Sequence, residues 1–313
     1  MVHSAPTIYN GRSWTRRTPN RDGFLDVDHA REKPAGVTRI GFFGDSYVEA
    51  LQVRLEDTFF RRLPSQISGK TIEAFGFGIS GWGTLHSLMA YRVMGPRYAL
   101  DDVVYLFELN DPGDHHYQVR SVPRPLAGLS EDGTDFILRI PAEGGGSRSL
   151  RIRRFLERRL LLARLIRVQL GRLHTNWEGR PAEVAGRVPR VPNQNDPPST
   201  WPPALLEDAR RLTRLILKRF RDEVVGDGRR FAVLYVPRAA QELDGTLPPA
   251  DSWFPWLSQT CAELGIRLLD PSALLSTQQA AGTTIYADHW TSAGHELIAA
   301  FLTRALADTV PAE

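Results

Sequence analysis

The sequence predicts an α/β protein built around a doubly wound parallel sheet. Five short apolar runs, for example residues 103–107, alternate with segments whose apolar residues recur at helical spacing. The runs are apolar almost throughout, as is typical of strands that are buried on both faces of a parallel sheet. Strands that alternate with helices imply right-handed crossovers, so we expect helices on both faces of one sheet.

In chain order, strands are predicted over 40–43, 71–75 and 103–107, with helices over 48–67 and 85–94 between them. The pattern is then interrupted and returns with helices over 205–225, 253–264 and 292–306 and strands over 231–236 and 266–269. We therefore expect a polar lead over 1–37, a sheet domain made of 38–111 and 204–310, and an insertion over 112–203 at the edge of the sheet.

Composition narrows the class of protein. A chain of 313 residues with 42% hydrophobic and 24% charged residues is ordinary for a soluble globular protein of one large or two small domains. It contains no run of about 18 apolar residues and no apolar signal-peptide core, so we expect a cytoplasmic location. Cys261 is the only cysteine, which excludes an intramolecular disulfide, and a net charge of +3 does not suggest a nucleic-acid partner.

Residues 39–50 are predicted to form a buried strand that ends at Gly44 and turns into a helix, with Ser46 on the turn. A serine there presents its hydroxyl at the carboxyl edge of the sheet, where ligands of open α/β folds bind. The N–H groups at the helix start would stabilise an anion that develops at the same place. The alternative is that Asp45 or Ser46 only caps the helix.

Residues 76–81 match the spacing G-x-G-x-x-G between a strand and a helix, and Asp101 follows about 20 residues later. We reject a dinucleotide site, because the acidic partner should end the next strand at its carboxyl edge and Asp101 precedes that strand. Two interpretations remain. The glycines form a tight turn, or the backbone of this turn, including Gly81, faces Ser46.

Two further polar residues follow or precede predicted elements at the same edge. Asn110 comes directly after the strand over 103–107, where its amide could donate to an oxyanion or form an ordinary Asx-turn. His289 precedes the last helix and could act as a general base there, although a lone histidine is more often a surface or core residue. His295 falls inside the helix, which favours a structural role.

In this order, Gly44-Asp-Ser46, Ile79-Ser-Gly81, Asn110-Asp111 and the segment 289–295 resemble the sequence blocks of the SGNH/GDSL hydrolases. The resemblance implies a flavodoxin-like three-layer α/β/α sandwich. It also implies that Ser46 is the nucleophile and His289 the general base. The oxyanion hole would consist of the Ser46 N–H, the Gly81 N–H and the Asn110 side chain, and no cofactor or metal would be needed.

The chain departs from the family pattern at two positions. Glu108 stands where the family usually has glycine, and Tyr286 stands where it has the catalytic aspartate. Asp288 is the nearest carboxylate, but adjacent side chains on an extended segment point to opposite faces. Asp288 reaches His289 only if the loop kinks; otherwise a backbone carbonyl, Tyr286 or a distant carboxylate orients the imidazole. We assign Asp288 as the third member of the triad.

The insertion contains a predicted basic amphipathic helix over 150–173, in which arginines alternate with apolar residues such as Phe155 and Leu162. Such a helix can contact an anionic membrane or a partner, or it can pack with a solvated arginine face.

A separate cluster contains side chains that could bind a metal, but its adjacent histidines lack the usual ligand spacing. The members of that cluster are Asp111, Asp114, His115 and His116.

Together these features predict a serine esterase that hydrolyses an O-acyl ester, for example an O-acetyl ester, on a carbohydrate or small molecule through an acyl-enzyme. Two other functions stay open at this point. An O-acyltransferase would pass the acyl group of the same intermediate to an alcohol. A non-catalytic binding module would keep the fold after loss of the triad acid.

Overall fold

The computed structural model describes residues 8–9, 12–13, 17–67, 69–120, 124–139, 192–237 and 240–307. The chain divides into two compact units. One comprises residues 1–121, 125–139 and 192–313, and the other comprises 122–124 and 140–191. All elements named below belong to the first unit. The predicted basic helix over 150–173 lies outside the described residues.

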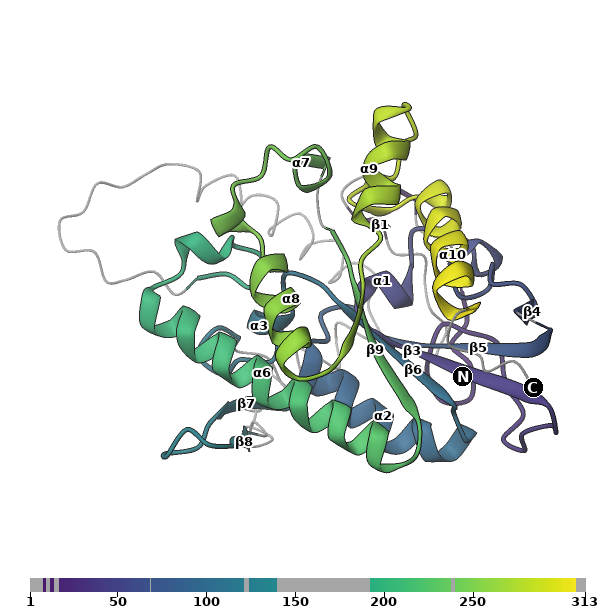
Figure 1. Cartoon of the computed structure of the whole chain (residues 1–313), viewed down its shortest axis with the longest axis horizontal. Helices are drawn as coiled ribbons and strands as arrows, with labels where there is room; N and C mark the ends of the chain where they lie inside the picture. Colours follow the sequence, from purple (N-terminus) through teal and green to yellow (C-terminus); the bar gives the residue numbers. More distant parts are fainter. Residues whose placement is uncertain are drawn as a thin grey trace, which may run out of the picture. The chain divides into compact units, whose positions relative to one another are not determined.

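A six-stranded sheet in the order β10-β9-β6-β3-β5-β4 forms the centre of this unit (Figure 1). Five of its strands run parallel, which confirms the predicted α/β fold. The short strand β4 was not predicted and pairs antiparallel with β5. The strands are β3 (Val37–Gly44), β4 (Gln66–Ile67), β5 (Lys70–Gly78), β6 (Asp102–Phe107), β9 (Arg230–Tyr235) and β10 (Arg267–Leu269).

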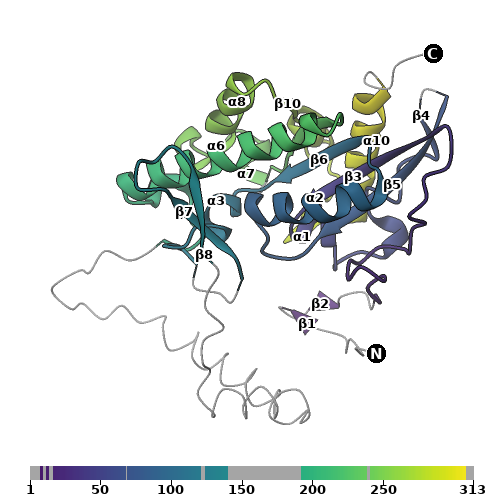
Figure 2. The same cartoon turned by 90° about the horizontal axis from the view of Figure 1, so that it is seen from below.

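Helices cover both faces of the sheet (Figure 2). Side chains alternate along β3, so Ile40 and Phe42 enter one hydrophobic core and Phe43 enters the other. Burial on both sides explains why the strands are apolar almost throughout. The core of Phe43 is covered by α2 (Thr84–Tyr98), α6 (Pro203–Gly226) and α8 (Phe254–Glu263), and the other core by α1 (Ser46–Glu49), α9 (Ser272–Ala280) and α10 (Ser292–Ala307).

The prediction of a helix over 48–67 is wrong. Helix α1 ends after four residues, because Ala50 adopts the left-handed conformation with φ of 48°. The chain continues as a loop with one short 3₁₀ helix, η1 (Leu55–Asp57), before β4. Phe59 and Phe60 lie in this loop, and their side chains are buried against the sheet. The apolar spacing therefore reflects loop side chains that fill the core, and not a continuous helix.

Several short elements complete the described structure. The hairpin of β7 (Leu126–Leu129) and β8 (Phe136–Arg139) falls in the range predicted as an insertion, and it contacts α6. Strands β1 (Ile8–Tyr9) and β2 (Arg12–Ser13) pair near the N-terminus. The others are α3 (Asp111–Asp114), η2 (Pro198–Thr200), α7 (Ala240–Leu243) and η3 (Pro249–Asp251).

The segment over 17–36 covers the outer edge of β5, beyond the point where β4 ends. Asp26 is buried, and its carboxylate accepts the Gly76 N–H at 3.0 Å. The same carboxylate contacts His29 Nε2 at 3.0 Å and Arg61 Nε at 3.4 Å. Arg61 in turn donates to the carbonyl of Ala74. Side chains thus satisfy backbone groups that a neighbouring strand would otherwise bind.

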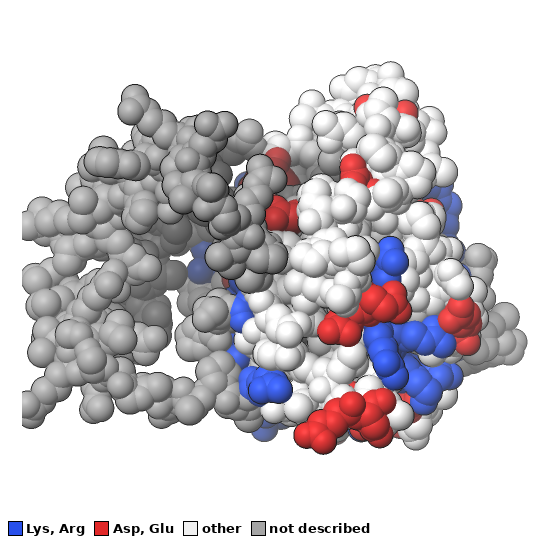
Figure 3. Space-filling model, turned by 90° about the vertical axis from the view of Figure 1, so that its left-hand side faces the viewer, with Lys and Arg blue, Asp and Glu red and all other residues white. Residues whose placement is uncertain are grey.

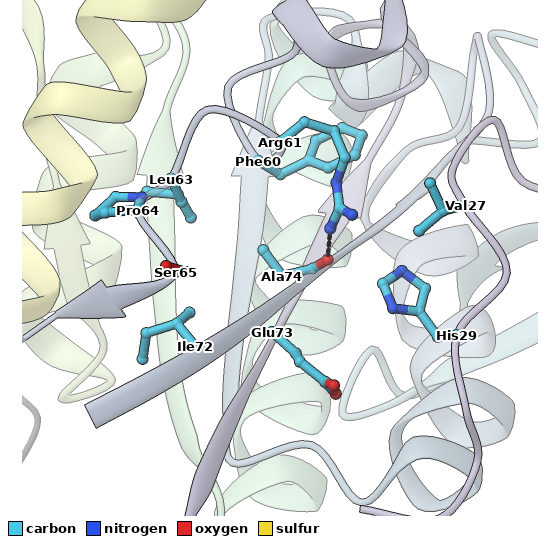
Figure 4. A pocket seen from close by; sticks show the side chains of 10 residues that line it. All are labelled: Val27, His29, Phe60, Arg61, Leu63, Pro64, Ser65, Ile72, Glu73 and Ala74. Atoms are coloured by element: carbon cyan, nitrogen blue, oxygen red, sulfur yellow. Dashed lines mark hydrogen bonds between the residues drawn. The ribbon is translucent and has the colours of Figure 1, made fainter.

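A cavity of about 290 Å³ lies beside this edge (Figure 4). It is bounded by His29 of the N-terminal segment, by the loop that carries Phe60 and Arg61, and by Ile72 to Ala74 of β5. Figure 4 shows the Arg61 guanidinium directed at the Ala74 carbonyl. The polar side chains of Arg61 and His29 are therefore engaged in holding the edge of the sheet.

Replacement of Asp26 by alanine should destabilise the fold by about 3–5 kcal/mol, because it leaves the Arg61 charge and the Gly76 N–H without their buried partner. Urea denaturation measures the change. Asp28→Ala is a matched control, since Asp28 lies two residues away and its exposed carboxylate accepts hydrogen bonds from Arg21. Equal unfolding midpoints for the two variants would contradict a structural role for Asp26.

Basic and acidic side chains lie next to each other on the face shown in Figure 3. Ion pairs along α6 follow the same mixed pattern, for example Lys218 with Asp222 and Arg219 with Asp135. None of the helices in the described part of the chain is both long and apolar enough to cross a membrane.

Candidate active site

Ser46 is the first residue of α1, directly beyond the carboxyl end of β3. Asp45 caps the helix, since its carboxylate accepts the Tyr47 N–H at 3.0 Å, so Ser46 is not the cap. Helix α1 packs straight onto the end of β5. A Cβ added to Gly78 would lie 2.4 Å from the Cβ of Val48, which only glycine avoids. Glycine at this strand end therefore lets the helix that carries Ser46 approach the sheet.

His289 lies beside Ser46, although 243 residues separate them in sequence. Its Nε2 is 2.8 Å from Ser46 Oγ. His289 belongs to a small hairpin made of β11 (Tyr286–Ala287) and β12 (His289–Trp290). The imidazole packs against the buried ring of Tyr47, with 4.8 Å between ring centroids. The structure therefore brings together the predicted nucleophile and base in hydrogen-bond contact.

Asp288 forms the tip of this hairpin and has φ of 87°, in the left-handed region. Aspartate tolerates that region better than most residues. The resulting kink turns its carboxylate toward the neighbouring imidazole, with Oδ2 at 3.3 Å from His289 Nδ1. Tyr286 does not orient the imidazole through its hydroxyl, which donates to the carbonyl of Pro237. Of the arrangements left open by the sequence, the structure has the kinked one.

These contacts are consistent with one tautomer of His289. With the proton on Nδ1, the nitrogen 3.3 Å from the Asp288 carboxylate, the lone pair of Nε2 is left to accept the Ser46 hydroxyl. Ser46 Oγ also lies 3.3 Å from a carboxylate oxygen of Asp45, a longer contact than that with His289. The geometry thus favours proton transfer from Ser46 to His289.

Asp45 joins three parts of the site and was recognised from the sequence only as a possible cap. One carboxylate oxygen accepts the Tyr47 N–H, and the other contacts Ser46 Oγ and, at 3.4 Å, Asn110 Nδ2. Burial raises the pKa of the Asp45 carboxyl, while these hydrogen bonds and the nearby His289 act in the opposite direction. Asp45 therefore fixes Asn110 relative to the nucleophile.

Asn110 immediately precedes α3, but its side chain makes no capping hydrogen bond to that helix. The amide donates instead to Asp45 Oδ2, the oxygen that also contacts Ser46 Oγ. The backbone of Asn110 is held by Glu108, whose carboxylate accepts the Asn110 N–H at 3.0 Å. Asp111 accepts the Glu108 N–H at 2.9 Å. The unusual Glu108 thus stabilises the turn that carries Asn110.

Gly81 lies in a β-turn closed by a hydrogen bond of 3.0 Å from the Trp82 N–H to the Ile79 carbonyl. Its φ of 75° is the conformation that the third position of a type II turn requires, and glycine adopts it without strain. Gly76 and Gly78 lie within β5 instead. Since α1 occupies the space at Gly78, the glycine pattern does not form a phosphate-binding loop here.

His295 and His115 make structural contacts away from Ser46. His295 is fully buried, and its Nδ1 accepts the Phe59 N–H at 3.2 Å. Burial lowers the pKa of His295 to about 3, so it is neutral at physiological pH. His115 Nε2 contacts Thr213, and Arg120 pairs with Asp114. Among the described residues, no three His, Cys, Asp or Glu side chains are placed to hold a metal ion.

Fold and site together define a class: an α/β protein that presents a serine–histidine pair at the carboxyl edge of a parallel sheet. No protein-family model matches the sequence, and neither does any curated protein. Solved structures similar to this chain include a member of the lipolytic G-D-S-L family from Veillonella parvula, at 12% identity and a TM-score of 0.43. That match covers 86% of this chain and 97% of the other.

Two further solved structures show a likeness of the same extent. A lipase/acylhydrolase from Enterococcus faecalis is 14% identical, with 88% of this chain and 98% of the other covered and a TM-score of 0.44. A catalytic mutant of an acetylxylan esterase from Geobacillus stearothermophilus is 13% identical, with 88% and 95% covered and a TM-score of 0.44.

Proposed function

We propose that this protein is a serine esterase of the SGNH/GDSL type that hydrolyses an O-acyl ester of a carbohydrate or small molecule. The observation that carries the proposal is the 2.8 Å contact between Ser46 Oγ and His289 Nε2. The kinked Asp288 beside the other imidazole nitrogen supports it. This arrangement favours an enzyme over a binding module that has lost its triad acid.

In the proposed reaction, Ser46 Oγ bonds to the ester carbonyl carbon while its proton passes to His289 Nε2. The carbonyl oxygen becomes an oxyanion that accepts hydrogen bonds from the Ser46 N–H, the Gly81 N–H and the Asn110 amide. As the carbon–oxygen bond of the alcohol breaks, the alcohol leaves with the proton from the imidazolium. Water then attacks the acyl-enzyme with His289 as base, which releases the acid and restores Ser46.

The direct test is reaction with a fluorophosphonate probe, which phosphonylates an activated serine. Purified protein should be labelled at Ser46, located by peptide mass spectrometry, and should release acid from p-nitrophenyl esters or acetylated sugars. Product analysis with an added alcohol separates hydrolysis from acyl transfer, since a transferase would form a new ester. A folded protein that neither labels nor hydrolyses any ester would contradict the proposal.

Asn110→Ala should lower kcat by about 10²–10³-fold, the usual cost of losing one oxyanion donor. The fold should remain intact, because the side chain does not cap α3. Asn110→Asp is the matched variant, since it keeps the size but replaces the donor with an acceptor, and it should be impaired at least as much. Unchanged kcat in both variants would mean that Asn110 only stabilises the turn and does not donate a hydrogen bond to the oxyanion.

A further inference from the structure

Glu49 connects two parts of the proposed oxyanion hole that are distant in sequence. It is the last residue of α1, three positions after Ser46. Its side-chain oxygen Oε2 accepts the Ser80 N–H at 2.8 Å, and the Ser80 hydroxyl donates to the same oxygen. Ser80 directly precedes Gly81 in the turn of residues 79–82. The carboxylate therefore bridges the helix of the nucleophile and the turn of the second backbone donor.

The bridge restrains the turn at the residue that controls the direction of the Gly81 N–H. That N–H belongs to the peptide group between Ser80 and Gly81, so its direction follows the backbone torsions of Ser80. Glu49 holds both the backbone N–H and the side chain of Ser80, which fixes the residue at two points. Ser80 is exposed, so without this contact its N–H would bind water and the turn would gain freedom.

Arg17 holds the other side of Glu49. Its guanidinium donates to the backbone carbonyls of Glu49, at 2.5 Å, and of Ala50. Burial lowers the pKa of Arg17 to about 10, and the neighbouring Glu49 charge opposes that shift. Arg17 thus remains charged at neutral pH and offsets the negative charge of Glu49. A carboxylate near a developing oxyanion would otherwise oppose the reaction.

We infer that Glu49 is a positioning residue for the oxyanion hole, which ties the Ser80–Gly81 turn to α1 so that the Gly81 N–H stays aligned with the Ser46 N–H. The inference rests on the proposed esterase function and adds a residue to it. Glu49 acts through Ser80 and does not touch the reacting atoms. Its contribution comes from its length and its ability to accept hydrogen bonds, and not from its charge.

Three substitutions separate length from charge. Glu49→Gln keeps the length and an acceptor oxygen but removes the charge, so kcat should stay within about threefold of wild type. Glu49→Asp keeps the charge but is one methylene too short, and Glu49→Ala removes the acceptor. Both should lose about 10–100-fold in kcat, since a displacement of about 1 Å can cost about 10²-fold. KM should change less than threefold in all variants.

The assay uses full-length protein with p-nitrophenyl acetate, together with the rate of fluorophosphonate labelling and a thermal melt of each variant. Glu56→Ala is the matched control, because this glutamate lies on η1 with a side chain that is 57% exposed and pairs with Arg54. It should leave kcat unchanged.

Unchanged kcat in Glu49→Asp and Glu49→Ala would overturn the inference while leaving the esterase proposal intact. Equal losses in Glu49→Gln and Glu49→Ala would overturn it too, because they would show that charge matters. An inactive, unlabelled wild type would remove the esterase proposal and this inference with it. If Glu49→Ala fails to fold, the contrast between the Gln and Asp variants still decides the outcome.

Discussion

Ser46→Ala should lower kcat by about 10⁶-fold and abolish labelling by a fluorophosphonate, because the variant has no oxygen that can form the acyl-enzyme. His289→Ala should lose nearly as much, since the hydroxyl then has no acceptor for its proton at 2.8 Å. The two residues act as a unit, so the double variant should be no slower than either single variant.

Turnover is measured with an activated ester under saturating substrate, and folding is checked by circular dichroism. Ser199→Ala is the control for nonspecific effects, since Ser199 is an exposed serine of the 3₁₀ helix η2 that contacts Asp251. Activity retained in pure Ser46→Ala would mean that another group carries the chemistry.

Asp288→Asn should reduce kcat by about 10³-fold. In serine proteases the equivalent change at a buried aspartate costs about 10⁴-fold, because the imidazole loses its orientation and its countercharge. The effect here should be smaller, since the Asp288 side chain is 56% exposed and water screens its charge at 3.3 Å from His289 Nδ1.

A second variant separates the carboxylate from the kink that presents it. Asp288→Gly removes the carboxylate but favours φ of 87°, so the hairpin should be retained with thermal stability equal to wild type or higher. Its kcat should fall as far as that of Asp288→Asn. A loss below about tenfold in both variants would leave a Ser46–His289 dyad, with an imidazole that needs no carboxylate.

Most of the sheet could be predicted from the sequence because buried parallel strands are nearly pure apolar runs, as residues 103–107 are. The helix over 48–67 could not, since Phe59 and Phe60 match helical spacing while packing from a loop. The spacing of apolar residues shows which side chains are buried, but it does not show whether those side chains lie on a helix or in a loop. The two-residue β4 is too short to have any pattern of its own.

The predicted site residues Ser46, Asn110 and His289 were found by their places after or before regular elements, and the fold brings them together at one edge. The orientation of Asp288 depends on a single torsion angle, which spacing alone does not determine. The contact of Glu49 with Ser80 spans 31 residues and joins a helix end to a turn, so no local sequence motif predicts it.

The covering of the β5 edge also bears on whether this sheet can pair with the sheet of a second molecule. A strand with unpaired N–H and C=O groups is a template for a strand of another molecule. Asp26 and Arg61 occupy these groups at Gly76 and Ala74 from within the same chain. Loss of the segment over 17–36 would remove Asp26 and leave the Gly76 N–H open to pairing with a strand of another molecule. The N-terminal segment therefore satisfies, within one molecule, part of a sheet edge that another strand could otherwise bind.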